Sequence, residues 1–170
     1  MADEIIYYAK PKNKKSKSVF SALLVTSIIL ALIANFTQKY SGIIWVFALA
    51  FITVTIYVYN RFVGSEYCYA INNDGGIPSF TVGMRAAKTS RTMARVDLSS
   101  ITEVRRMSRD EYRAHKCEKG VVKYPYFPTM FSDEVYLVAV RSEYEKADIF
   151  IEADVEFISA LESYVVKAED

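Results

Sequence analysis

Two long uncharged apolar runs, residues 19–36 and 42–59, constrain the fold of this chain more than any other feature. Each run is eighteen residues long and holds no Asp, Glu, Lys or Arg. An α-helix of that length measures about 27 Å, close to the ~30 Å hydrocarbon core of a bilayer. Only residues 37–41 separate the runs, which is enough for a tight turn. The sequence therefore predicts a transmembrane α-hairpin.

A signal peptide and a soluble core hairpin both fit the apolar runs less well than membrane spans do. A signal peptide has an apolar core of about 7–15 residues followed by a small-residue cleavage site. The first run is longer, Asn35-Phe36-Thr37 is a poor cleavage site, and a second run follows at once. A core hairpin of a soluble protein usually keeps a polar face, whereas these runs are apolar all round. We therefore expect two membrane-spanning helices.

The flanking charges indicate which way the hairpin faces. The loop between the runs holds only Lys39, and Arg61 follows the second run. Five lysines precede the first run: Lys10, Lys12, Lys14, Lys15 and Lys17. Excess Lys and Arg mark the cytoplasmic side, and Tyr40 and Trp45 suit the outer interface. The sequence predicts a multi-pass protein of the cytoplasmic membrane with both termini inside the cell.

Small and polar residues within the runs predict how the two helices meet. Ser27, Ala31, Ala34 and Asn35 would allow close helix–helix contact. We expect packing within the hairpin, with contact between copies of the chain as the alternative. No ionisable residue lies at membrane depth, which argues against a proton or ion path.

The charged residues outside the hairpin are sorted along the chain, although 21 basic and 20 acidic residues nearly cancel overall. Residues 85–123 hold eleven basic and five acidic side chains, whereas residues 133–170 hold three basic and eleven acidic ones. The basic segment could contact anionic lipid, to which each well-placed Lys or Arg contributes about 1 kcal/mol. Alternatively, the basic and acidic segments neutralise one another within the fold.

The cysteines and the single histidine predict neither a disulfide framework nor a metal site. Cys68 and Cys117 have no paired spacing, which suits a reducing compartment. His115, Cys117 and Glu118 lie close together, but a structural zinc site needs four ligands. We expect no metal and no cofactor.

Short strand-like segments replace the apolar runs from residue 66 onward. Residues 66–72 (EYCYAIN) are rich in aromatic side chains and end in the turn signal Asn-Asp-Gly-Gly at 73–76. Residues 79–84 alternate, which places Phe80, Val82 and Met84 on one face. Residues 90–96 are a weaker strand, and residues 97–107 (DLSSITEVRRM) predict a turn followed by another strand.

The remaining segments continue this pattern. Residues 108–120 are charged throughout and predict a protruding loop or a short helix. Residues 121–127 are extended, but their prolines confine the end of that strand to a sheet edge or a bulge. Residues 134–140 (EVYLVAV) form the clearest buried strand, and residues 148–152 form the last one.

An amphipathic helix closes the chain. Asp154 suits its N-cap, and its exposed face carries Glu156 and Glu162. Apolar residues recur at helical spacing: Phe157, Ile158, Leu161 and Val165. The sequence thus predicts an α+β membrane protein, with an N-terminal transmembrane α-hairpin before an antiparallel β-sandwich or partly open barrel. About seven strands and the C-terminal helix would make up that polar part.

This order of elements resembles a pleckstrin-homology (PH) fold, and more closely the bacterial membrane proteins in which a two-helix hairpin precedes a PH-like domain. The residues that carry the likeness are 69–75 (YAINNDG), 97–104 (DLSSITEV) and 149–154 (IFIEAD) running into the last helix. The charged insert at 108–120 and the stretch Tyr-Pro-Tyr-Phe-Pro at 124–128 depart from the pattern.

The resemblance divides the chain into three parts. It implies a basic cytoplasmic tail over residues 1–18, the transmembrane hairpin over 19–63 and a cytoplasmic PH-like domain over 64–170. It also implies a module for binding or assembly, without naming a ligand. Four arginines are the candidates for contact with an anionic lipid or a partner: Arg105, Arg106, Arg109 and Arg113. The alternative is that these arginines belong to a solvated charged loop.

No enzyme motif stands out. The Asn-Asp-Gly-Gly stretch at 73–76 has the composition of a hairpin turn, not of a phosphate-binding loop. A nucleophile–histidine site would depend on His115 alone. Adjacent carboxylates such as Asp110 and Glu111 would point to opposite faces of a strand. No catalytic residue is therefore predicted.

Three hypotheses for the function follow. The first is a non-catalytic scaffolding or interaction module, held at the inner membrane surface, with a protein partner or a second copy of the chain. The second is an accessory subunit of a larger transport or envelope-assembly complex, contacted through the hairpin. The third is a small membrane-bound enzyme, which would need a deep polar pocket where Asp, Arg and His115 converge. The bilayer is an expected partner, and nucleic acid is not.

Overall fold

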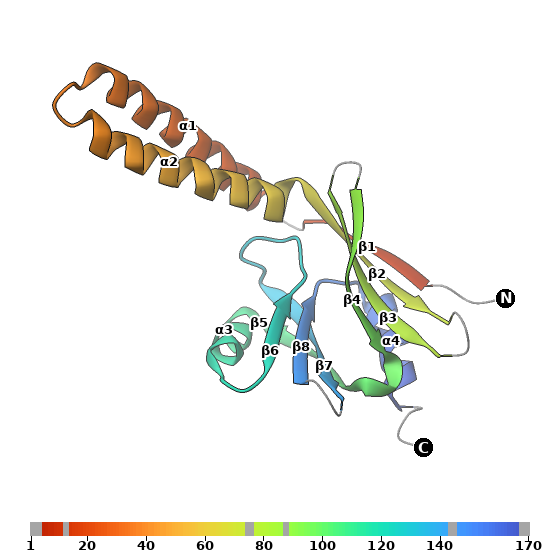
Figure 1. The fold of residues 1–170 in the computed structure, drawn as a ribbon. Coiled ribbons are helices and arrows are strands. Elements are labelled where there is room, and N and C mark those ends of the chain that lie inside the picture. Colours follow the sequence, from red (N-terminus) through yellow and green to blue (C-terminus); the bar gives the residue numbers. More distant parts are fainter. Residues whose placement is uncertain (1–4, 12–13, 74–76, 87–88, 143–145, 167–170) are drawn as a thin grey trace.

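The computed structural model describes residues 5–11, 14–73, 77–86, 89–142 and 146–166. An apolar helical hairpin projects from a domain built of two β-sheets and further helices (Figure 1). Helix α1 spans Lys15–Phe36, and α2 spans Ser41–Val58 and continues into the π-helical turn η1, Tyr59–Val63. Both helices are long and apolar enough to cross a membrane, and only 11% and 17% of their apolar windows are buried. The hairpin therefore does not belong to the core of the domain.

The two hairpin helices pack through small and polar side chains. Ala34 and Ala48 are buried between them, and the hydroxyl groups of Ser27 and Thr55 lie 3.4 Å apart. These contacts confirm the predicted packing at Ser27 and Ala34. Asn35 instead faces outward, and its side chain donates a hydrogen bond to the Ala31 carbonyl of its own helix.

A strand precedes the hairpin. Strand β1, Ile5–Ala9, pairs antiparallel with β2, Ser65–Asn72, in the register Ile5↔Ile71 to Ala9↔Tyr67. This corrects the prediction that all of residues 1–18 form a basic tail, because part of the segment belongs to the domain. The five residues of β1 are too few for a periodic pattern to show beside a lysine-rich stretch. The hairpin is thus inserted between two paired strands.

Sheet A has the strand order β1-β2-β3-β4, with every pair antiparallel. Strand β3 spans Ser79–Ala86 and β4 spans Thr89–Asp97. Phe80 and Val82 of β3 are fully buried, as the alternation at 79–84 predicted. A short 3-10 turn, Leu98–Ser100, leads from this sheet to the next.

Sheet B has the order β5-β7-β8-β6. Its strands are β5 at Ile101–Ser108, β6 at Val122–Pro125, β7 at Glu134–Arg141 and β8 at Lys146–Ile151. Strand β6 is an edge strand, as its prolines predicted, because proline has no N–H for a second neighbour. It runs parallel to β8, however, which corrects the expectation of wholly antiparallel sheets. The described residues thus form eight strands, one more than predicted.

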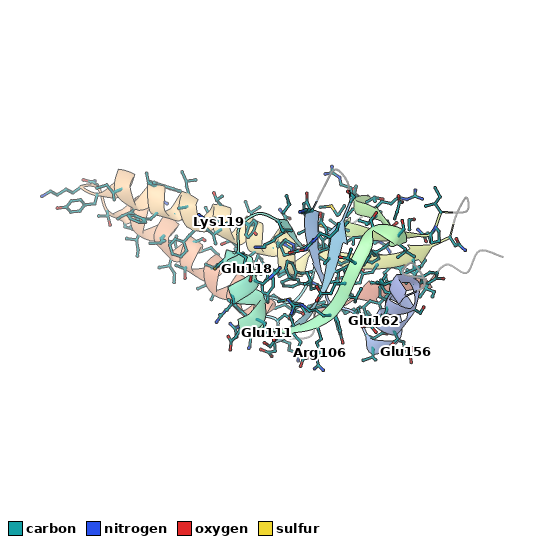
Figure 2. The ribbon with its side chains drawn as sticks, turned by 90° about the horizontal axis from the view of Figure 1, so that it is seen from below. Arg106, Glu111, Glu118, Lys119, Glu156 and Glu162 are labelled. Atoms are coloured by element: carbon teal, nitrogen blue, oxygen red, sulfur yellow. The ribbon has the colours of Figure 1, made fainter. Side chains whose placement is uncertain are left out.

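Helix α4, Val155–Val166, packs over the sheets as predicted. Its first turn is capped by Asp154, whose Oδ1 accepts a hydrogen bond from the Phe157 amide at 2.9 Å. Phe157, Ile158 and Leu161 are buried in the main core, together with side chains of both sheets. Glu156 and Glu162 point away from the sheets (Figure 2).

Tyr69 ties the two sheets together at the centre of the main core. Its hydroxyl donates to the Tyr126 carbonyl at 2.5 Å and accepts from the Glu152 amide at 3.3 Å. Burial raises the pKa of the Tyr69 phenol well above its ordinary value, so the hydroxyl stays protonated and able to donate.

The Tyr69 hydroxyl can be tested by substitution. Tyr69→Phe should lower the free energy of unfolding by about 1–3 kcal/mol, because two buried backbone groups lose a partner. Denaturant unfolding of the intact protein in detergent measures the change. Tyr8→Phe is the control, because Tyr8 is 55% exposed; equal stability of the two variants would contradict this role.

Candidate functional site

The base of the hairpin is fixed to the domain by Arg61. Its guanidinium donates hydrogen bonds to the Tyr67 hydroxyl and to the Pro125 carbonyl. The same group lies over two aromatic rings, 5.3 Å from the centroid of Phe62 and 5.1 Å from that of Tyr67. Only Gly64 separates η1 from β2, so the second hairpin helix and sheet A are joined with almost no linker and have a fixed relative orientation.

Helix α3, Arg109–Cys117, forms within the charged insert, as one of the two predicted alternatives. Ser108 and Glu111 form a capping box at its start. The hydrogen bond from the Ser108 backbone N–H lowers the pKa of the Glu111 carboxyl, which keeps this cap ionised. Tyr112 fastens the helix to sheet B, with ring-centroid distances of 5.6 Å to Phe127 and 4.9 Å to Phe150.

A cavity of about 270 Å³, the junction pocket, lies where the hairpin base, α3 and the β6–β7 connection meet. Figure 1 shows that connection rising from the sheet toward the hairpin base. The lining residues are Phe62, Arg109, Tyr112, Arg113, Phe127, Thr129, Met130, Phe131 and Ser132. The described lining is therefore mostly apolar, with two guanidinium groups and no carboxylate.

The structure separates the four predicted arginines into two pairs. Arg109 and Arg113 are one helical turn apart on α3 and line the junction pocket. Arg105 and Arg106 lie on β5 and pair with Glu103 and Glu134. Arg106 is 60% exposed and points away from the domain (Figure 2).

The Arg106–Glu134 pair also helps to explain why basic and acidic residues occupy separate segments of the sequence. It joins the basic segment to the acidic one, and the hydrogen bond to Glu134 raises the pKa of Arg106. Mutual neutralisation therefore accounts for part of the charge sorting. Among the described residues no ion pair holds Arg109, and Arg113 of the same pocket lies 4.0 Å from the exposed Asp110 of its own helix, so pairing between the basic and acidic segments does not reach these two arginines.

The sequence analysis missed the aromatic side of the pocket. Phe127 and Phe131 belong to or follow the proline-aromatic stretch at 124–128, whose departure from a strand pattern was the available signal. Phe131 has a φ of 57°, a left-handed conformation that bulky residues rarely adopt, and is 51% exposed. The Arg109 guanidinium lies 5.6 Å from its ring centroid. Such an exposed aromatic side chain in an unfavourable backbone conformation points to a function for this loop.

Comparison with known protein families matches residues 6–168 to the family "Bacterial PH-like domain (DUF6106)". The chain belongs to this bacterial PH-like family. The matched range begins within β1 and includes both hairpin helices. No curated protein matches the chain.

A polar cluster lies between α3 and sheet B. Asp148 of β8 has no exposed side-chain surface; its Oδ1 accepts from Arg141 at 2.8 Å and its Oδ2 lies 2.7 Å from His115 Nε2. The other ring nitrogen of His115 is 2.8 Å from Glu118. The cluster fastens α3 to sheet B.

This cluster brings together the Asp, Arg and His115 that an enzyme hypothesis would need. Both carboxylate oxygens of Asp148 and both ring nitrogens of His115 are already engaged by protein groups. Among the residues that the structure describes, no group of three or more His, Cys, Asp or Glu is placed to hold a metal ion.

The Asp148 cluster predicts a large effect on stability. Asp148→Asn should lower the free energy of unfolding by about 3 kcal/mol, because it removes the buried carboxylate that holds both Arg141 and His115. Glu103→Gln is the matched control, since Glu103 is 52% exposed and its pair should contribute less than about 1 kcal/mol. Denaturant unfolding in detergent compares them, and a smaller loss for Asp148→Asn than for Glu103→Gln would contradict the assignment.

Proposed function

We propose that this PH-like protein is a non-catalytic interaction module, tethered by its hairpin to the inner face of the cytoplasmic membrane. The family supports a binding or scaffolding role. The proposal adds a location for that role: the junction pocket is the recognition site, and the hairpin holds it against the membrane surface.

The exposed surface of the hairpin supports membrane insertion. Large apolar side chains point outward along both helices, among them Ile28, Leu32, Val46 and Phe47, all at least half exposed. A hairpin with such a surface would be poorly soluble in water and is suited to hydrocarbon. The lysine excess before the first apolar run supports termini on the cytoplasmic side.

Thiol labelling tests this topology, because Cys117 is exposed on the domain. In a Cys68→Ser background, a membrane-impermeant maleimide should label Cys117 in inverted vesicles and not in intact spheroplasts. With both native cysteines replaced, Gln38→Cys in the hairpin loop should show the opposite pattern. Labelling of Cys117 from outside would overturn the proposed orientation.

The observation that carries the proposal is the composition of the junction pocket. An apolar cavity with a few convergent polar groups is the usual form of a recognition site. Here Arg109 and Arg113 are the charged groups, and Phe62 places the hairpin base in the same wall. Ligand binding in this pocket would therefore occur at the membrane surface.

Photocrosslinking in native membranes tests whether the pocket is a recognition site. A benzophenone amino acid in place of Phe131 should give a discrete adduct, and Arg113→Glu should reduce its yield at least several-fold. The same probe at Val155, which is 70% exposed on α4, serves as the control site. An adduct at 131 that is insensitive to Arg113→Glu, or a stronger adduct at 155, would contradict the proposal.

A second candidate is an accessory subunit contacted through the hairpin. The observation in its favour is a groove of about 210 Å³ on the hairpin, lined by Phe20, Leu24, Ser27, Ile52, Thr55, Ile56 and Tyr59. A helix of another membrane protein could fill this groove. Replacing the hairpin with an unrelated helical pair would then abolish complex formation, whereas a junction-pocket function would persist.

A further inference from the structure

The junction pocket lies next to the end of the second apolar run, at the depth of the lipid headgroups. This step depends on the proposed membrane insertion. The apolar run ends at Tyr59, and Phe62 of the pocket lies three residues further along the same helical segment. That distance is about 4–5 Å at the rise of a helix, while the headgroup layer of one leaflet is about 5–8 Å deep. Lipid headgroups are therefore the molecules most concentrated at the pocket.

The charges of the pocket select the kind of headgroup. Arg109 and Arg113 carry two positive charges, and the described lining has no carboxylate to offset them. Asp110 lies 4.0 Å from Arg113 and is itself 94% exposed, so water screens its charge. Guanidinium groups bind phosphate oxygens with paired hydrogen bonds. A phosphate whose headgroup carries no compensating positive charge fits this pair best.

The apolar walls suit the part of a lipid next to the phosphate. Phe62, Phe127 and Met130 face the cavity beside the arginines. Pockets for whole drug-sized ligands measure about 300–1,000 Å³, so a cavity of about 270 Å³ suits a headgroup with its glycerol, and not the acyl chains. The chains would remain in the adjoining leaflet.

Phe131 completes the site at its rim. Its ring is 51% exposed and lies beneath the Arg109 guanidinium. Aromatic side chains with a polar neighbour concentrate at the membrane interface. The left-handed backbone at Phe131 holds the ring outside the domain core, where it can enter the headgroup layer.

We propose that the junction pocket binds one anionic phospholipid of the leaflet that surrounds the hairpin base. The lipid phosphate lies between Arg109 and Arg113, its glycerol lies against Phe62 and Met130, and Phe131 inserts beside it. The bound lipid would fix the angle between the PH-like domain and the membrane. This inference deepens the proposed function by naming the ligand of the same site.

Lipid retention by the intact protein tests the proposal. The protein is placed in nanodiscs of mixed phosphatidylglycerol and phosphatidylcholine, and retained lipids are counted by native mass spectrometry after release. We expect about tenfold enrichment of phosphatidylglycerol over its share in the disc, since one charge-assisted contact changes affinity about tenfold. No enrichment in the wild-type protein would overturn the proposal.

Two double variants separate the pocket from general charge. Arg109→Gln with Arg113→Gln should remove the enrichment, whereas Arg105→Gln with Arg106→Gln should keep it within about twofold. Each double variant loses two positive charges, and the two pairs come from neighbouring stretches of the sequence. Equal losses in the two variants would overturn the pocket. Phe131→Ser gives a further measurement and should weaken retention while leaving the arginines in place.

The photocrosslinking result distinguishes failure of this inference from failure of the proposed function. An adduct at position 131 that depends on Arg113 and proves to be protein, together with no lipid enrichment, would leave the recognition site standing and exclude the lipid. An adduct that is an anionic phospholipid agrees with both. Loss of both the adduct and the enrichment would contradict both proposals.

Discussion

The pairing of β1 with β2 across the helical hairpin is the constraint on which the rest of the structure depends. The two strands are joined through the whole hairpin, yet they lie side by side in the register Ile5↔Ile71. Both ends of the hairpin therefore enter the same sheet, at neighbouring positions. A tether with two attachment points limits rotation of the domain much more than a single flexible linker would, because a single linker fixes only distance.

Side-chain contacts also hold the hairpin and α3 in place against the two sheets. Arg61 connects the end of the second helix to β2 and β6, and the Asp148 cluster holds α3 against sheet B. The junction pocket lies between these two anchored elements and the β6–β7 connection, which supplies the rest of its lining. A domain built in this way keeps a fixed orientation to its hairpin.

The sequence predicted the elements whose signal is local. The hairpin followed from two uncharged runs, and β7 and α4 from apolar patterns within a single segment. Strand β1 was not predicted, because five residues are too few to show a periodic pattern. Its partner strand also lies on the other side of the hairpin in the sequence. The parallel pairing of β6 with β8 was not predicted either. Prolines indicate that a strand lies at the edge of a sheet, but they do not indicate which strand lies beside it. Of the four candidate arginines, sequence spacing could not separate the pair on β5 from the pair on α3.

The sequence by itself determined that this chain has two helices of membrane-spanning length, a β-rich domain behind them and a capped C-terminal helix. It could do so because hydrophobic periodicity and charge are properties of short segments. The tertiary structure decided that the hairpin interrupts a pair of neighbouring strands, that Asp148 meets His115 and Arg141, and that Arg109 and Arg113 share a cavity with Phe62 and Phe131. These features join residues far apart in the chain, and only the packing of the two sheets brings such residues together.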